Sequence, residues 1–202
     1  MKRAFDYLVA VIGLVLLFPL FVVVGILIKV DSSGPIFFRQ ERIGKGFRPF
    51  LIYKFRTMVE DAARRGAAIT VGADPRITRV GGYLRQTKID ELPQLVNVLM
   101  GEMSLVGPRP EVARYVEMFR KDYEEILQVR PGITDLASLR YQNESEWLSR
   151  FDQPELEYVN HVLPEKIKLA KNYVQRTSMS GDIVLILKTV PKLFGAKVKS
   201  IH

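Results

Sequence analysis

The run LVAVIGLVLLFPLFVVVGILI, from Leu8 to Ile28, decides how this chain folds. It carries no charged residue, and it matches the length of about 20 residues with which a helix crosses the hydrocarbon core of a bilayer. We therefore expect residues 1–33 to form a membrane-embedded helix. The residues that follow the run, Lys29 to Gly34, are a poor match to a signal-peptide cleavage site, and the run is longer than the apolar region of a usual signal peptide, so we do not expect cleavage.

Two features bear on how this helix sits in the bilayer. Pro19 lies inside the run, where it removes a backbone hydrogen bond and bends or breaks a helix. A helix bent at Pro19 that enters and leaves through one leaflet keeps both ends on the same side, whereas a straight span with a tolerated proline separates them. Basic residues, which favour the cytoplasmic side, flank both ends of the run: Lys2, Arg3, Lys29, Arg39, Arg42, Lys45 and Arg48. From the residues alone, both arrangements stay open.

The charge of the chain indicates anionic partners. The 202 residues carry a formal net charge of +8, and the pI is about 9.7. Nucleic acid, a phosphorylated substrate and acidic lipid all fit this balance. Cysteine is absent, which excludes disulfides and cysteine-based zinc sites. The length allows one compact domain, residues 34–202, beside the membrane helix.

A small β-hairpin is predicted directly after the membrane segment. The two strand candidates are Ile36–Ile43 and Leu51–Met58, and the turn-rich segment Gly44–Pro49 joins them. Because side chains alternate along a strand, Lys54 and Arg56 should share one face of the second strand.

The remainder of the chain is predicted to be mostly helical, which gives an α+β fold class. The C-terminal segment Asp182–Phe194 is apolar and punctuated by lysines, so it fits an amphipathic helix at a membrane interface as well as a core helix with a solvated face. Apolar spacing and helix-start signals predict further helices: Asp61–Ala68, Val80–Lys88, Pro93–Met100, a longer one from Pro110 that ends before Arg130-Pro131-Gly132, and Pro154–Thr177 with a restart at Pro164.

Charged residues that suit phosphate chemistry are concentrated between Arg76 and Glu111. Guanidinium groups bind phosphate oxygens in pairs, and carboxylates hold Mg²⁺ that bridges to substrate phosphates. An aspartate can also attack phosphorus and form an acyl phosphate. Interleaved cations and carboxylates are what diphosphate chemistry requires. The cluster contains Arg79, Arg85, Lys88, Asp90, Glu91, Arg109 and Glu111.

The adjacent pair Asp90-Glu91 allows two interpretations. It precedes Pro93, so it can merely cap the helix that follows, as an isolated pair of this kind usually does. It can also be the chemical centre of the cluster. In either case the positive end of the following helix should favour the ionised form of Asp90.

Several motifs along the chain, taken in order, resemble those of one protein family. The blocks occur in the order Phe38–Gly44, Lys54-Phe55-Arg56-Thr57-Met58, Asp90-Glu91-Leu92-Pro93-Gln94-Leu95 with Asn97-Val98-Leu99, Met103–Glu111 and Arg130-Pro131-Gly132-Ile133-Thr134. Together with the apolar N-terminus they resemble the bacterial sugar transferase family, the monotopic polyprenyl-phosphate phosphoglycosyl transferases. The resemblance covers nearly the whole chain, and it is to the small form that begins at the catalytic core.

The resemblance implies a two-step reaction and a set of roles. The residue matching the family nucleophile, Asp90, would attack the β-phosphate of a UDP-sugar, release UMP and pass the phosphosugar to a polyprenyl phosphate. Glu91 would bind Mg²⁺ with Asp90 or assist its activation. Basic residues of the family match Lys54, Arg85 and Arg109, which we assign to phosphate contacts, and Glu111 would be a polar substrate contact.

The resemblance also implies a location and a topology. The N-terminal helix would be re-entrant at Pro19, and the domain of residues 34–202 would lie at the cytoplasmic face of a bacterial inner membrane. Acidic lipids are further expected partners, and nucleic acid is not. The chain departs from the common family pattern at Phe18, before the proline, and at Asp135, Ser138 and Tyr141–Glu144. The departures at Asp135, Ser138 and Tyr141–Glu144 fall in a region suited to line the sugar pocket, so the identity of the donor sugar stays open.

Overall fold

The computed structural model describes residues 1–62, 70–72, 74–141 and 143–189. Helices predominate in it, beside one two-stranded antiparallel sheet and one short parallel pair of strands, which confirms the α+β, mostly helical class. Most of the predicted helix Asp61–Ala68 and the last residues of Asp182–Phe194 lie outside the described residues.

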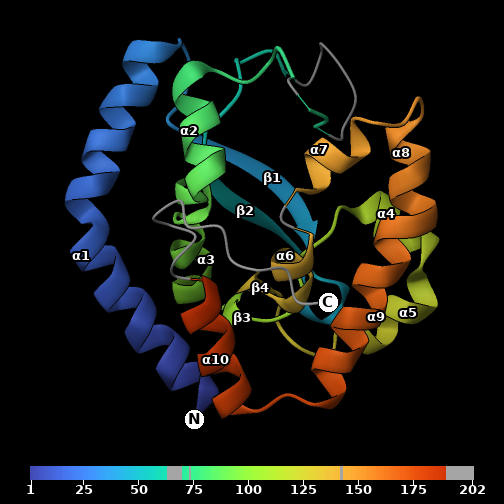
Figure 1. Ribbon diagram of the computed structural model, residues 1–202. Helices are drawn as coiled ribbons and strands as arrows, with labels where there is room; N and C mark the ends of the chain where they lie inside the picture. Colours follow the sequence, from blue (N-terminus) through green and yellow to red (C-terminus); the bar gives the residue numbers. More distant parts are fainter. Residues whose placement is uncertain (63–69, 73, 142, 190–202) are drawn as a thin grey trace.

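Helix α1, Lys2–Asp31, is the longest element and continues through Pro19. It runs along one side of the molecule, is visibly bowed, and packs against α2, Arg79–Thr87, and α3, Gln94–Met100 (Figure 1). It is the one helix of the described residues that is long and apolar enough to cross a membrane. Its outer face leaves large apolar side chains exposed, among them Leu8, Ile12, Val15, Leu16, Phe18, Val22, Val23, Ile26, Leu27 and Val30.

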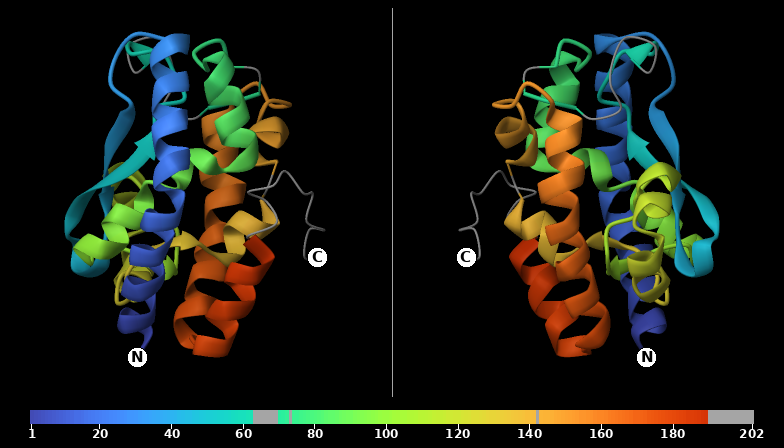
Figure 2. Two further views of the ribbon diagram at one scale, coloured as in Figure 1. Left: turned by 90° about the vertical axis from the view of Figure 1, so that its left-hand side faces the viewer. Right: turned by 90° about the vertical axis from the view of Figure 1, so that its right-hand side faces the viewer.

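Polar contacts bind the N-terminal end of α1 to the rest of the domain. The Ser104 hydroxyl donates a hydrogen bond of 2.7 Å to the carboxylate of Asp6. The Lys2 ammonium donates to the carbonyl oxygen of Val106 at 3.1 Å and pairs with the buried carboxylate of Asp182. This end of α1 is therefore fixed to α10, Met179–Thr189, and both lie at the same end of the molecule (Figure 2).

The C-terminal end of α1 is bound to the same domain by Arg56. Its guanidinium donates to the backbone oxygens of Ser32, at 2.8 Å, and Ser33. The carboxylate of Asp31 accepts from the backbone N–H of Val80 at 2.9 Å. Both ends of the apolar helix thus contact one domain.

The predicted hairpin is present. Strand β1, Phe37–Ile43, pairs antiparallel with β2, Pro49–Phe55, and Gly46 adopts a positive φ of 65° in the turn between them. The second strand ends at Phe55 and not at Met58. The expectation that Arg56 shares a face with Lys54 is therefore wrong, because Arg56 leaves the strand to bind the end of α1.

A second strand pair was not predicted. Strand β3, Ser104–Val106, pairs parallel with β4, Gly132–Thr134, and brings two motif blocks together. A Cβ at Gly132 would lie 2.0 Å from the backbone nitrogen of Gly107, so only glycine permits this contact. Three-residue strands leave too little periodic signal to be found in a sequence.

The C-terminal half of the chain is built from short helices. The predicted long helix after Pro110 is interrupted at Phe119, whose φ and ψ of −118° and 36° are not helical. Residues from this half form one apolar cluster with Tyr115, Val116, Tyr123 and Leu163 at its centre. The helices are α4, Ala113–Met118; α5, Arg120–Ile126; α6, Leu136–Arg140; α7, Glu144–Leu148; α8, Pro154–Glu157; a π turn, Tyr158–Val162; and α9, Leu163–Gln175.

Helix α10 has features of both alternatives that its sequence allowed, a core helix and an amphipathic helix with an apolar outer face. Leu185 is buried in the core, and Asp182 is buried in its contact with Lys2. The opposite face of the helix exposes apolar side chains: Met179, Ile183, Val184 and Leu187.

Candidate active site

Asp90 and Glu91 lie in a short 3-10 turn, Ile89–Glu91, between α2 and α3. Lys88 ends α2 in the left-handed conformation, with φ 59°, and so turns the chain sharply into this segment. Ile89 packs into the apolar cluster of Val24 and Ile28 from α1. The turn that carries the carboxylate pair is therefore anchored to the long apolar helix through Ile89.

Glu91 is held by two cations from distant parts of the chain. The ammonium of Lys54 on β2 lies 2.9 Å from Glu91 Oε1. Arg109, which follows β3, donates from Nη1 to Glu91 Oε2 at 3.1 Å and from Nη2 to Oε1. This is the two-bond geometry that planar guanidinium and carboxylate groups favour. Three predicted site residues thus meet at one point.

The side chain of Asp90 is buried, with 8% of the residue exposed. Its Oδ1 atom accepts no hydrogen bond from any described residue. A buried carboxylate oxygen without a donor is costly, so such an atom calls for an explanation. Among the predicted site residues that the structure describes, Asp90 is the one with a buried side-chain oxygen that accepts no hydrogen bond.

Burial and nearby charges shift the pKa values of Asp90 and Glu91 in opposite directions. Burial, reinforced by the charge of Glu91, raises the pKa of Asp90 against the influence of Lys54, Lys88 and Arg85. Burial would also raise the pKa of Glu91, but Arg109 and Lys54 together hold it well below its ordinary value. The net shift is upward, opposite in direction to the influence expected from the positive end of the following helix, because desolvation by burial is the largest contribution to the pKa of Asp90.

Arg85 lies in α2, before Asp90 in the chain, and Thr57 fixes the position of its side chain. Its Nε donates to the Thr57 hydroxyl at 2.8 Å. Burial lowers the pKa of Arg85, while the negative charge of Asp90 is the largest influence that raises it. Arg85 therefore adds a positive charge to the field around Asp90, as the sequence predicts.

Glu111 has partners within the protein. Its Oε1 accepts a hydrogen bond of 2.8 Å from the buried Tyr158 hydroxyl, and its Oε2 lies 3.7 Å from the Arg42 guanidinium. The charge of Glu111 is also felt by Arg109. The described side-chain contacts of Glu111 are therefore with Tyr158 and Arg42, and its contact with substrate stays a prediction.

A small cavity of about 20 Å³ opens beside Arg109 and Glu111. Asp135 and Lys166 contribute polar groups to its lining, and Tyr123 and Leu163 are among its apolar residues. Asp90 does not line it. This cavity therefore lies on the Arg109 side of the site and does not reach Asp90.

The described residues offer two adjacent carboxylates for a metal ion, Asp90 and Glu91, and no cluster of three or more acidic, histidine or cysteine ligands. Mg²⁺ is commonly bound by one or two carboxylates, with water and substrate phosphate completing its octahedron. The unused oxygen of Asp90 fits that role, whereas both oxygens of Glu91 already accept from Arg109.

Asn97 is a positioning residue that the sequence analysis did not single out. It is fully buried, and its side-chain oxygen accepts from the Tyr53 backbone N–H at 3.0 Å. Its amide nitrogen donates to the Leu51 carbonyl at 2.8 Å and to Glu102 at 2.7 Å. Asn97 therefore completes the free edge of β2 and fixes the strand that carries Lys54 against α3.

Replacing Asn97 with alanine is expected to lower the free energy of unfolding by about 3 kcal/mol, because two backbone groups of β2 lose their partner inside the core. Urea unfolding in detergent, followed by circular dichroism, measures this loss. Asn172→Ala, at an exposed position of α9, is the matched control and should change stability little. Equal stability of the two variants would contradict the role of Asn97.

Comparison with known proteins gives a consistent result. Residues 1–196 match the family model described as bacterial sugar transferase. A UDP-N-acetylgalactosamine-undecaprenyl-phosphate N-acetylgalactosaminephosphotransferase of Aeromonas hydrophila is 38% identical over 206 residues, covering 97% of this chain and 45% of that protein. A UDP-glucose:undecaprenyl-phosphate glucose-1-phosphate transferase of Xanthomonas campestris is 38% identical over 200 residues, covering 97% of this chain and 39% of the relative.

A shorter relative is matched over most of its length. The exopolysaccharide production protein ExoY of Sinorhizobium fredii is 36% identical over 205 residues, covering 94% of this chain and 84% of that protein. This chain thus spans less than half of the two longer relatives and most of the shorter one.

Proposed function

We propose, from the premise that this chain belongs to the bacterial sugar transferase family, that it transfers a sugar-1-phosphate from a UDP-sugar to undecaprenyl phosphate or a similar polyprenyl phosphate. The observation that carries the proposal is the buried Asp90 oxygen without a donor, beside a cluster of cations. The relatives are named for such transfers with N-acetylgalactosamine or glucose, so the donor sugar of this chain is open.

The proposed reaction has two displacements at one phosphorus atom. In the first, a carboxylate oxygen of Asp90 bonds to the β-phosphorus of the UDP-sugar, and the bond from that phosphorus to the bridging oxygen breaks, so that UMP leaves. In the second, an oxygen of the polyprenyl phosphate bonds to the same phosphorus and Asp90 is released. The product is a diphosphate-linked lipid sugar.

The side chains around Asp90 have separate roles in this scheme. Lys54, Arg85 and Arg109 supply the positive charge that lets an anionic carboxylate approach an anionic diphosphate. Glu91 holds two of these cations in place. We further propose that Mg²⁺ would be held by the free oxygen of Asp90, and by Glu91 once donor phosphate has replaced it on Arg109, and that the ion would supply additional charge neutralisation.

A competing mechanism keeps the reaction and changes the role of Asp90. Here Asp90 and Glu91 only bind metal, and the lipid phosphate attacks the donor directly. Incubating the full chain with UDP-sugar labelled in the sugar, Mg²⁺ and no lipid acceptor separates the two. The covalent mechanism predicts a labelled protein and one equivalent of UMP, whereas direct attack predicts neither.

The proposed membrane placement has α1 entering and leaving the cytoplasmic leaflet. It is supported by the binding of both ends of α1 to one domain, through Lys2 and Asp6 at one end and Arg56 at the other. A helix of 30 residues is about 45 Å long, so a straight span would carry these two sets of contacts to opposite sides of the bilayer.

Cysteine labelling tests this placement, because the chain has no native cysteine. We expect Ala4→Cys and Ser33→Cys, both at exposed positions, to react with a membrane-impermeant maleimide only after the cytoplasmic side of the inner membrane is opened. A spanning helix would expose one of the two sites to reagent from the outside of intact spheroplasts.

A further inference from the structure

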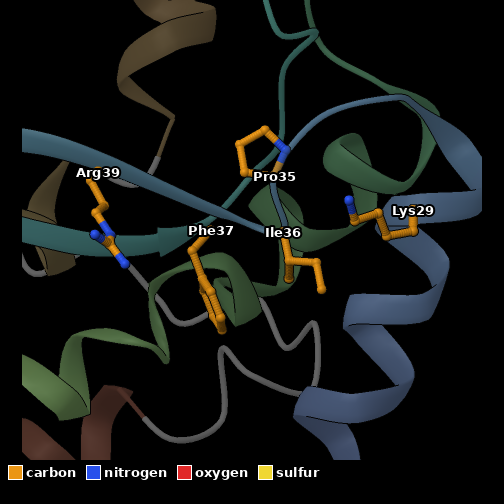
Figure 3. Close-up of a pocket in the computed structure, with 5 residues that line it drawn as sticks. All are labelled: Lys29, Pro35, Ile36, Phe37 and Arg39. Carbon is orange, nitrogen blue, oxygen red and sulfur yellow. The ribbon is translucent and has the colours of Figure 1, made fainter.

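A cavity of about 530 Å³ lies where α1 ends and β1 begins. Five residues line it: Lys29, Pro35, Ile36, Phe37 and Arg39. In the close-up the apolar side chains of Ile36 and Phe37 lie between the basic side chains of Arg39 and Lys29 (Figure 3). The cavity thus has an apolar floor with a cation at either side.

The two cations have no anionic partner among the described residues. The side chain of Lys29 forms no hydrogen bond or ion pair there, and that of Arg39 only lies over the ring of Tyr53, 4.9 Å from its centroid. None of the five lining residues is acidic. An anion in the cavity would therefore meet two available cations and no repelling carboxylate in its lining.

Apolar surface continues from the cavity onto the neighbouring elements. Val30, beside Lys29, is 81% exposed, and Ile26 one turn earlier in α1 is 58% exposed. On β1, Phe37, which lines the cavity, is 40% exposed. A ligand that fits both the cations and this surface carries an anionic head and an alkyl chain.

The cavity lies on the face of the hairpin that points away from the cluster around Glu91. Arg39 pairs across the sheet with Tyr53, and Phe37 pairs with Phe55, so these four side chains share one face. Lys54, between Tyr53 and Phe55, projects to the other face and reaches Glu91. A lipid in the cavity is therefore separated from the reacting groups by the sheet.

We propose that this cavity is a binding site for an acidic phospholipid, with the headgroup phosphate between Lys29 and Arg39 and the acyl chains along the exposed face of α1. The site is distinct from that of the lipid acceptor. It depends on the proposed membrane placement of α1, and it does not depend on the proposed transfer reaction.

Titration of the full chain in neutral detergent tests the proposal, with short-chain phosphatidylglycerol as the probe and isothermal calorimetry as the readout. We expect saturable binding, and about thirtyfold weaker binding in the double variant Lys29→Gln/Arg39→Gln. Short-chain phosphatidylcholine and inorganic phosphate should bind neither protein measurably, because one lacks net charge and the other lacks an alkyl chain.

Two control variants separate a specific site from general charge. Lys45→Gln/Arg48→Gln removes the same charge from exposed positions at the far end of the hairpin and should bind as tightly as the unchanged protein. Lys29→Arg/Arg39→Lys keeps both cations and should also retain binding.

Several outcomes would overturn the site. Unchanged affinity in the Lys29/Arg39 double variant, an equal loss in the Lys45/Arg48 pair, or equally tight binding of inorganic phosphate would each do so. Displacement of the probe by polyprenyl phosphate, with a raised KM for the acceptor in the Lys29/Arg39 variant, would assign the cavity to the acceptor instead. Failure of the proposed reaction would appear separately, as absence of UMP release from the unchanged protein.

Discussion

Asp90→Asn is expected to reduce UMP release by roughly a thousandfold or more, because an amide cannot replace the carboxylate as a nucleophile toward phosphorus. The substitution preserves the shape of the side chain and removes its negative charge, so the buried site should keep its fold. A coupled assay of UMP release with UDP-sugar, Mg²⁺ and polyprenyl phosphate measures the loss.

A matched control for this variant is Asp152→Asn, at an exposed position between α7 and α8. It should leave turnover unchanged. Thermal unfolding of both variants in detergent should coincide with that of the unchanged protein within a few degrees. Normal turnover in Asp90→Asn would end the covalent proposal.

Arg109→Lys is expected to lower turnover by about a hundredfold, the usual effect of removing one preorganised donor from a developing anion. The guanidinium of Arg109 spans both oxygens of Glu91, and an ammonium offers a point charge without that fork. A lysine also leaves Glu91 less well satisfied inside the protein, so the pKa of Glu91 should rise from its lowered value.

Arg114→Lys is the corresponding control, because Arg114 forms an exposed pair with Glu155 and its side chain is 60% exposed. It should turn over normally. If Arg109→Lys lost only stability and kept its turnover per folded molecule, Arg109 would be a structural residue alone.

The elements with a long repeating pattern could be predicted from the sequence. The apolar run gave α1, and alternation with a glycine-rich turn gave β1 and β2. The pairing of β3 with β4 could not be predicted, since each strand has three residues and the contact joins segments far apart in the chain. The break at Phe119 was missed because the apolar spacing continues through it.

That Lys54, Glu91 and Arg109 belong to one charged cluster could be predicted from the sequence, whereas their contacts could not, and their roles in catalysis stay predictions. Ordered motif blocks indicated Lys54, Asp90, Glu91 and Arg109. The ion pair of Lys54 with Glu91 joins residues 37 positions apart, which depends on how β2 packs against the turn before α3. The raised pKa of Asp90 likewise follows from tertiary burial, which the sequence pattern near Pro93 does not report.

In the proposed reaction, the carboxylate of Glu91 would occupy the position of the donor phosphates until they bind. That carboxylate occupies the donors of Lys54 and Arg109 that we assign to the diphosphate, so the empty site keeps its cations ordered and neutralised. Under the proposal, donor entry would be a counterion exchange, in which phosphate oxygens replace carboxylate oxygens on Lys54 and Arg109 and leave Glu91 free to help hold the Mg²⁺ that would neutralise the added charge. The reverse exchange, with Glu91 reclaiming both cations, would help to expel UMP once it has been cleaved from the sugar phosphate.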